Sequence, residues 1–370
     1  MTGPRIALPL ALACACAIGA LTVVPRAIEA EALLYAQDDP ALLADRELAR
    51  SFNRSVAARE IEAALAADDV DLAKSFLDLA ADRNVAVDPD LAGRVQAGSS
   101  GVATAVRTAT KFGHGFVTGE PDDLVGLAGT AVGDLFVFGD IRDAVREGAR
   151  LASGEQVDEM ILGLACVGLV VTAGTYISAG VGTPARVGVS VVKAARRTGR
   201  ITVQMSDWLA RSAREAVDWS KLSGAVRGAS LAEPAVLVRA ARESVKVEKT
   251  RELVRVVGDV GRVQAKAGTQ AAIDGLKIAQ GPRDMSRVAR LAETKGTRTR
   301  AILKTLGRSA IFLTSSAITL FSWLFTAVMM VFGFCAAVKR TAERATERYC
   351  ERRRARLARQ RLRFAAMTAR

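Results

Sequence analysis

Residues 309–338 read SAIFLTSSAITLFSWLFTAVMMVFGFCAAV, and no charged side chain interrupts them. The block is longer than the ~20 apolar residues with which a helix crosses a bilayer, so it would tilt, overhang the bilayer or bend into a hairpin. Arg308 precedes the block, and Lys339 and Arg340 follow it directly. This pattern predicts a transmembrane segment whose ends are held by basic residues at the membrane surface.

The C-terminal tail, residues 339–370, is strongly basic, with 12 Lys and Arg against 3 Glu. Arg352, Arg353 and Arg354 form the densest part of a predicted basic helix. Anionic lipid headgroups attract such segments, and basic residues near a span are retained on the cytoplasmic side. We therefore expect a cytoplasmic tail that sets topology, contacts anionic lipids and, having few aromatic side chains for base stacking, binds no nucleic acid.

Two further blocks are uncharged and long enough to span. Residues 6–24 form the apolar core of a predicted signal peptide or uncleaved signal anchor over residues 1–30, and Ala30-Glu31-Ala32 offers a cleavage site. Residues 160–183 are long enough to cross a bilayer and rich in glycine, which favours close helix packing. This second block is either a span or a buried helix of the core.

Charge is segregated between these blocks. Residues 31–159 carry 12 Lys and Arg against 24 Asp and Glu, whereas residues 160–308 carry 26 against 11. Membrane topology leaves such a pattern, but three single crossings would put the basic tail outside. Either residues 160–183 do not cross, which leaves the whole middle in the periplasm, or residues 309–338 fold back as a hairpin. We favour the first arrangement, because each hairpin arm would be short for a crossing.

The segments between the blocks have helical patterns. The acidic region 31–97 contains an αα-hairpin, with helices over 55–65 and 70–81, and a further short helix from Pro89. The remaining predicted divisions are a glycine-rich apolar module over 98–185 and a basic amphipathic region over 186–308. A long helix is predicted over 235–264 within the basic region. The predicted fold is all-α and membrane-anchored, with amphipathic helices and one to three transmembrane helices.

The glycine-rich module contains one charged helix between two apolar ones. Asp140 follows Gly139 and is predicted to cap the start of the charged helix, on which Asp143 and Glu147 lie one turn apart. Ser153 and Gln156 form a capping-box pattern before the apolar block at 160–183.

The sequence offers little catalytic chemistry. His114 is the single histidine, so a multi-histidine metal site within the chain is excluded. With Asp134, Asp140 and Asp143 it forms a candidate polar cluster. No nucleophile elbow, phosphate-binding glycine loop or EF-hand spacing accompanies these residues. We predict no catalytic residue, no metal ligand and no cofactor.

The functional prediction is a non-enzymatic bacterial envelope protein that acts through protein or lipid contacts. It would lie in the inner membrane, with a periplasmic portion, a protein partner of unspecified kind and anionic lipids at its basic residues. Helix faces of small residues also favour oligomerisation. Two alternatives are a membrane-perturbing or pore-forming protein, in which residues 124–138 and 160–183 insert as a hairpin, and a membrane-bound enzyme that uses His114 and nearby carboxylates.

Overall fold

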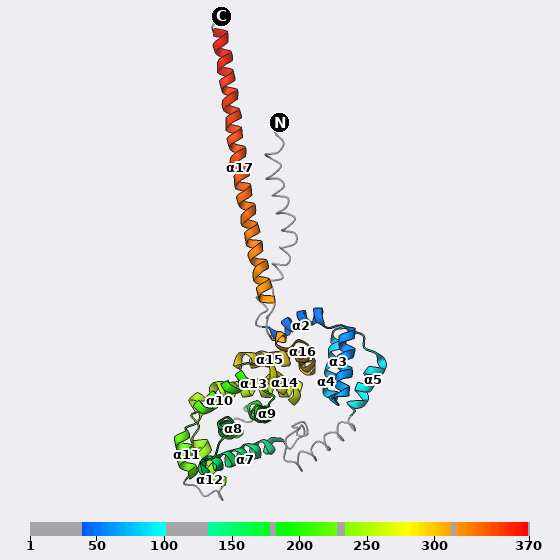
Figure 1. Cartoon of the computed structure of the whole chain (residues 1–370), viewed down its shortest axis with the longest axis vertical. Helices are drawn as coiled ribbons and strands as arrows, with labels where there is room; N and C mark the ends of the chain where they lie inside the picture. Colours follow the sequence, from blue (N-terminus) through cyan, green and yellow to red (C-terminus); the bar gives the residue numbers. More distant parts are fainter. Residues whose placement is uncertain (1–38, 101–131, 178–182, 228–233, 312–315, 369–370) are drawn as a thin grey trace. The chain divides into compact units, whose positions relative to one another are not determined.

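The computed structural model describes residues 39–100, 132–177, 183–227, 234–311 and 316–368 (Figure 1). Most of these residues are helical, and the only β-type pairing among them is an isolated bridge between Val217 and Val245. The all-α prediction is therefore confirmed. The predicted signal segment over 1–30 and His114 lie outside the described residues.

The chain divides into two compact units. One, which we call the body, comprises Asp38–Phe312, and the other comprises Met1–Gln37 and Leu313–Arg370. The described part of the second unit is a single helix, α17 (Ser316–Thr368).

The first helices of the body include the predicted hairpin. Asp39, Asn53 and Asp69 each accept hydrogen bonds from backbone N–H groups of the helix that follows them, which is how N-caps begin helices. A left-handed residue, Asp68 (φ 54°), makes the turn inside the hairpin. The helices are α2 (Pro40–Ser51), α3 (Arg54–Ala66), α4 (Val70–Asp82) and α5 (Pro89–Gly98).

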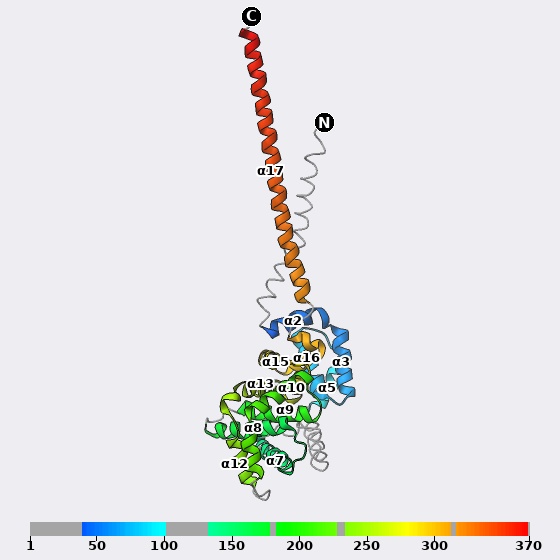
Figure 2. The same ribbon diagram turned by 60° about the vertical axis from the view of Figure 1, so that its left-hand side comes forward.

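The apolar block at 160–183 supplies a core helix of the body. This helix, α8 (Glu159–Ile177), packs against helices on several sides, as the two views in Figures 1 and 2 show. Leu164, Ala165 and Cys166 are fully buried. Its neighbours are α7 (Val132–Ser153), α9 (Thr183–Arg197), α10 (Val203–Ala216) and α12 (Pro234–Glu243). In the structure, the described part of this block, residues 160–177, packs as a helix within the body.

Helices α9 and α13 (Arg251–Ala267) approach each other closely and form the pair with the most extensive contact among the described helices. A Cβ atom added at Gly188 would lie 1.7 Å from the carbonyl oxygen of Val257, and one at Gly261 would lie 1.8 Å from that of Pro184. Only glycine lets two helix backbones approach this closely.

The predicted helix over 235–264 is wrong in one respect, because it is broken between α12 and α13. Lys246 N–H donates to the carbonyl of Ala216, and Asp218 N–H donates to that of Ser244. Because of this pairing with the segment before α11 (Trp219–Arg227), the backbone at Val245 is extended and not helical. A short 3₁₀ turn, η3 (Val247–Lys249), then leads into α13.

The acidic first helices dock on the basic last helices of the body. Arg300, which is 7% exposed, donates to both carboxylate oxygens of Asp69 at 2.5 and 2.6 Å and to Asp274 at 3.0 Å. Lys295 pairs with Asp45 at 2.6 Å. The C-terminal elements are α14 (Thr269–Ile278), α15 (Pro282–Lys295), η4 (Gly296–Arg298), α16 (Thr299–Leu306) and η5 (Gly307–Ala310).

The apolar block at 309–338 is divided between the two units. Ala310 and Ile311 are fully buried in the body, whereas residues 316–338 form the first part of α17. Within the described residues, Phe325–Arg359 is the one helical stretch long and apolar enough to cross a membrane, and none of its most apolar window is buried.

Candidate functional site

The candidate polar cluster of the sequence is a buried ion cluster between α7 and α9. Asp140 and Asp143, each 1% exposed, face Lys193 and Arg197 of α9. The prediction that Asp140 caps a helix is wrong, because α7 runs unbroken from Val132 to Ser153 through this residue. Asp134 also lies on α7, but its side chain is outside the described part of the structure.

Lys193 joins the two carboxylates. Its Nζ donates to Asp140 Oδ1 at 2.5 Å and lies 2.7 Å from Asp143 Oδ2. Arg197 Nη2 donates to Asp143 Oδ1 at 2.5 Å. Because buried charges are costly unless they are paired, the contact of each carboxylate with at least one cation makes this arrangement self-consistent.

Burial and charge shift the two carboxyl groups in opposite directions. Burial raises the pKa of Asp140 to about 6, although the nearby charge of Lys193 lowers it. Burial also acts to raise the pKa of Asp143, but Lys193 and Arg197 together hold that pKa below its usual range. Asp143 is thus the firmly charged member, and Asp140 is the member that gains a proton at mildly acidic pH.

The wall of the cluster is α8. A Cβ atom at Gly168 would lie 2.2 Å from Asp140 Oδ2, so glycine makes room for the carboxylate. Burial, and then the negative charge of Asp140, raise the pKa of the Cys166 thiol to about 12. Cys166 is therefore a packed, unreactive thiol and not a nucleophile.

A third acidic residue of α7 fixes the start of α8. Glu147 is buried, accepts a hydrogen bond from Arg150 at 3.1 Å, and also accepts one from the backbone N–H of Asp158 at 3.3 Å. Asp158 in turn accepts from the N–H groups of Met160 and Ile161. Asp158 caps α8, so the predicted capping box at Ser153 is wrong.

The cluster is suited to holding helices together. Both aspartates are engaged by cations, and no group of three or more metal-ligating side chains occurs in the part of the chain that the structure describes. The spacing of basic residues on α9 could have predicted this ion cluster from the sequence. Arg186, Lys193 and Arg197 recur at intervals of seven and four, which puts them on one helix face, opposite acids that recur similarly on α7.

The predicted surface cations belong to two different units. Arg308 lies in η5 of the body, where it pairs with Asp284 at 3.3 Å. Arg340, Arg352, Arg353 and Arg354 are exposed on α17, as is Lys339, which lies 4.0 Å from Glu343.

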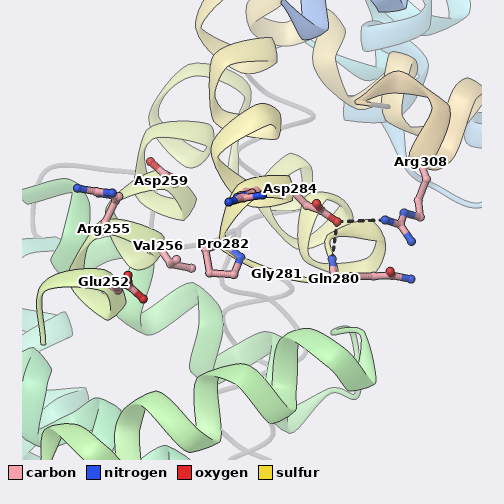
Figure 3. Close-up of a pocket in the computed structure, with 10 residues that line it drawn as sticks. Glu252, Arg255, Val256, Asp259, Gln280, Gly281, Pro282, Asp284 and Arg308 are labelled. Atoms are coloured by element: carbon pink, nitrogen blue, oxygen red, sulfur yellow. Dashed lines mark hydrogen bonds and ion pairs between the residues drawn. The ribbon is translucent and has the colours of Figure 1, made fainter. Parts of the chain in front are cut away.

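Arg308 also lines a pocket of about 530 Å³ between α13, the start of α15 and η5 (Figure 3). The pocket has charged walls of both signs. Its charged lining residues are Glu252, Arg255, Asp259, Arg283, Asp284 and Arg308. Sequence reasoning did not single out this pocket, because its walls come from three separate segments.

The chain matches no protein-family model, and no curated protein or solved structure is significantly similar to it, so its site must be interpreted from its own residues.

Proposed function

We propose that the chain is a membrane-anchored, non-enzymatic protein of the bacterial envelope. In this proposal α17 crosses the inner membrane, the basic tail lies in the cytoplasm, and the body works in the periplasm through contacts with protein or lipid. The body supplies a rigid helical surface, and the anchor keeps that surface at the bilayer.

The observation that carries the proposal is the exposed apolar surface of α17. Phe325 is 57% exposed, Val331 is 62% exposed and Phe332 is 71% exposed. Full burial of such a side chain contributes about 1.5–3 kcal/mol, so a helix bearing many of them is strongly favoured to enter an apolar phase. At ~1.5 Å per residue, the uncharged residues 316–338 extend about 35 Å, which exceeds the ~30 Å hydrocarbon core.

The ion pairs of the body support a location on one side of the membrane. Acidic residues before α8, such as Asp69 and Asp143, pair with basic residues after it, such as Arg300 and Arg197. Such pairs cannot form across a bilayer. Pairing within the body thus accounts for the segregated charge of residues 31–308. Only the basic tail is then interpreted by the positive-inside rule, which favours its cytoplasmic location.

Site-specific labelling tests the topology. Cys14, Cys16, Cys335 and Cys350 are replaced by serine, while Cys166 is kept because it is fully buried. A single new cysteine is then placed at an exposed alanine, either in the body (Ala265→Cys) or in the tail (Ala355→Cys). Intact bacterial cells expressing each variant are treated with a membrane-impermeant maleimide, before or after lysis.

We expect the Ala265→Cys variant to be labelled in intact cells and the Ala355→Cys variant only after lysis. The chain without a new cysteine measures the background from Cys166. Labelling of the Ala265→Cys variant only after lysis would mean that the body lies in the cytoplasm, which contradicts the proposed topology. Recovery of the full chain in the soluble fraction would overturn the anchoring itself.

The other two predicted functions have less support. Insertion of α7 and α8 as a pore-forming hairpin would require separation of Asp140 and Asp143 from Lys193 and removal of α8 from the core. The enzyme alternative relies on His114, which lies outside the described residues, and on nearby carboxylates, of which Asp140 and Asp143 are held by cations. We therefore propose the contact function alone.

A further inference from the structure

The pocket between α13, α15 and η5 contains three charged side chains that are not held in the hydrogen bonds and ion pairs of its walls. Glu252, Arg255 and Arg283 are exposed, and none forms a hydrogen bond or ion pair with another described residue. The pocket's volume of about 530 Å³ lies within the ~300–1,000 Å³ typical of ligand sites.

The remaining charges of the pocket are already paired. Asp284 accepts hydrogen bonds from the N–H of Gln280 at 2.9 Å and from Arg308 at 3.3 Å. Asp259 accepts one from Arg262. The charged groups without a hydrogen-bonded partner are therefore two guanidinium groups and one carboxylate, and one of the guanidinium groups, that of Arg255, also acts electrostatically on Asp259.

Figure 3 shows how these walls are arranged. Glu252 and Arg255 lie on one side of the pocket, on α13, and the Asp284–Arg308 pair lies on the other, with Pro282 between them. Arg283 follows Pro282 at the start of α15. A ligand in this pocket meets both signs of charge within the same opening.

We propose that this pocket binds the phosphoethanolamine headgroup of a membrane phospholipid. The phosphate would accept hydrogen bonds from Arg255 and Arg283, and the primary ammonium would donate to Glu252. Guanidinium groups suit phosphate oxygens, and a carboxylate suits an ammonium. A headgroup with both charges complements the unpaired residues better than an anionic headgroup, which would leave Glu252 facing its negative charge.

Chain connectivity favours a lipid as the source of this group. Arg308 precedes Ser316, the first residue of α17, by only eight residues in the sequence. This inference rests on the proposed anchoring of α17 in a bilayer, which would bring lipid headgroups to the body at high local concentration.

The test uses the full chain in nanodiscs of choline phospholipid that contain a small fraction of photoactivatable phosphatidylethanolamine. The matched probe is photoactivatable phosphatidylcholine, which has the same phosphate but a quaternary ammonium without N–H donors. Crosslinked peptides are mapped by mass spectrometry. We expect crosslinks at the pocket to be about fivefold more abundant for the ethanolamine probe, as loss of a charge-assisted hydrogen bond at an exposed site implies.

Three variants separate the roles of the side chains. Glu252→Gln should abolish the preference for ethanolamine over choline while retaining residual crosslinking of both. Arg255→Gln and Arg283→Gln should each reduce crosslinking of both probes about fivefold. Glu248→Gln and Arg290→Gln, at exposed positions outside the pocket lining, are the matched controls and should change nothing.

Equal crosslinking of the two probes, or unchanged crosslinking in Arg283→Gln, would overturn the assignment. Saturable binding of soluble glycerophosphoethanolamine without lipid crosslinks would assign the pocket to a free ester instead. The fraction of protein in the nanodisc is measured in the same samples. Protein that does not enter the nanodisc would count against the anchoring. Nanodisc-bound protein without crosslinks would count against the pocket alone.

Discussion

Asp140 and Lys193 form a buried ion pair, with Asp140 Oδ1 2.5 Å from Lys193 Nζ, although 53 positions separate them in the sequence. The pair joins α7 to α9, while α8, which lies between them in the chain, provides the wall through Gly168. The apolar helix that resembles a membrane span in sequence is thus enclosed by the charged helices on either side of it.

Removal of Lys193 should destabilise the body. Lys193→Met leaves Asp140 buried without its hydrogen-bonded cation, and breaking one partner of a buried pair costs about 3 kcal/mol. We expect the free energy of unfolding to fall by about that amount at pH 7, as measured by urea denaturation of the full chain in non-ionic detergent. The loss should be smaller at pH 5, where Asp140 takes up a proton.

The matched control is Lys277→Met. Lys277 is exposed and pairs with Asp274 at 3.1 Å one turn away, so its removal should cost less than about 1 kcal/mol. An equal effect of the two substitutions would mean that Lys193 is not buried against α7.

The two aspartates should give opposite pH dependences. The pKa of Asp140 is raised from 3.8 to about 6 in the folded protein, so the folded state binds a proton that the unfolded state does not between these values. The contribution of Asp140 to stability should therefore increase as pH falls from about 6 towards 4. The pKa of Asp143 is lowered, so its contribution persists above pH 3.8 and is lost only at lower pH.

Urea denaturation between pH 4 and pH 7.5 on the native chain, Asp140→Asn and Asp143→Asn checks this expectation. The stability of the native chain relative to Asp140→Asn should rise on acidification through pH 6. Relative to Asp143→Asn it should stay constant over the same range. Parallel curves for the native chain and Asp140→Asn would show that Asp140 lacks the environment described here, and a difference from Asp143→Asn that changes with pH in this range would show the same for Asp143.

The contrast between α4 and α7 shows what the sequence could predict. The hairpin of α3 and α4 follows from local signals, since the apolar spacing, the cap at Asp69 and the turn at Asp68 all lie within a few residues. The role of Asp140 depends on a partner in α9. Without that partner, an aspartate after a glycine has the pattern of a helix start, and the inward-facing acids of α7 have the pattern of a solvated face.

The same limit explains the break before α13. Residues 235–264 have a helical pattern, and only the distant segment at Ala216–Val217 turns Val245 and Lys246 into extended backbone. Charge segregation was interpreted as topology for a similar reason. Counting charges shows their sign and position, but it does not reveal that Asp69 and Arg300 are partners.

Two glycines of α13 should respond oppositely to replacement by alanine. Gly261→Ala would put a Cβ atom 1.8 Å from the carbonyl oxygen of Pro184, and forcing the backbones apart should cost about 2–3 kcal/mol. Gly258→Ala adds its Cβ in open space and should stabilise the helix by about 0.5–1 kcal/mol. Urea denaturation compares the two variants directly. Equal stabilities would contradict the close packing of α9 on α13.

The docking of the acidic helices on the basic ones predicts a strong coupling between Asp69 and Arg300. A double-mutant cycle with Asp69→Asn, which keeps a capping side chain for α4, and Arg300→Met should give a coupling energy of about 2 kcal/mol. The pair is bidentate and Arg300 is buried, so 1 M salt should weaken it only partly.

The more exposed pair of Asp82 and Arg298 provides the comparison. The same cycle with Asp82→Asn and Arg298→Met should give about 0.5 kcal/mol, and high salt should remove most of it. A coupling energy near zero between Asp69 and Arg300 would mean that α4 and α16 do not meet. The acidic and basic segments could then lie on opposite sides of a membrane. That result would contradict the placement of the whole body on one side.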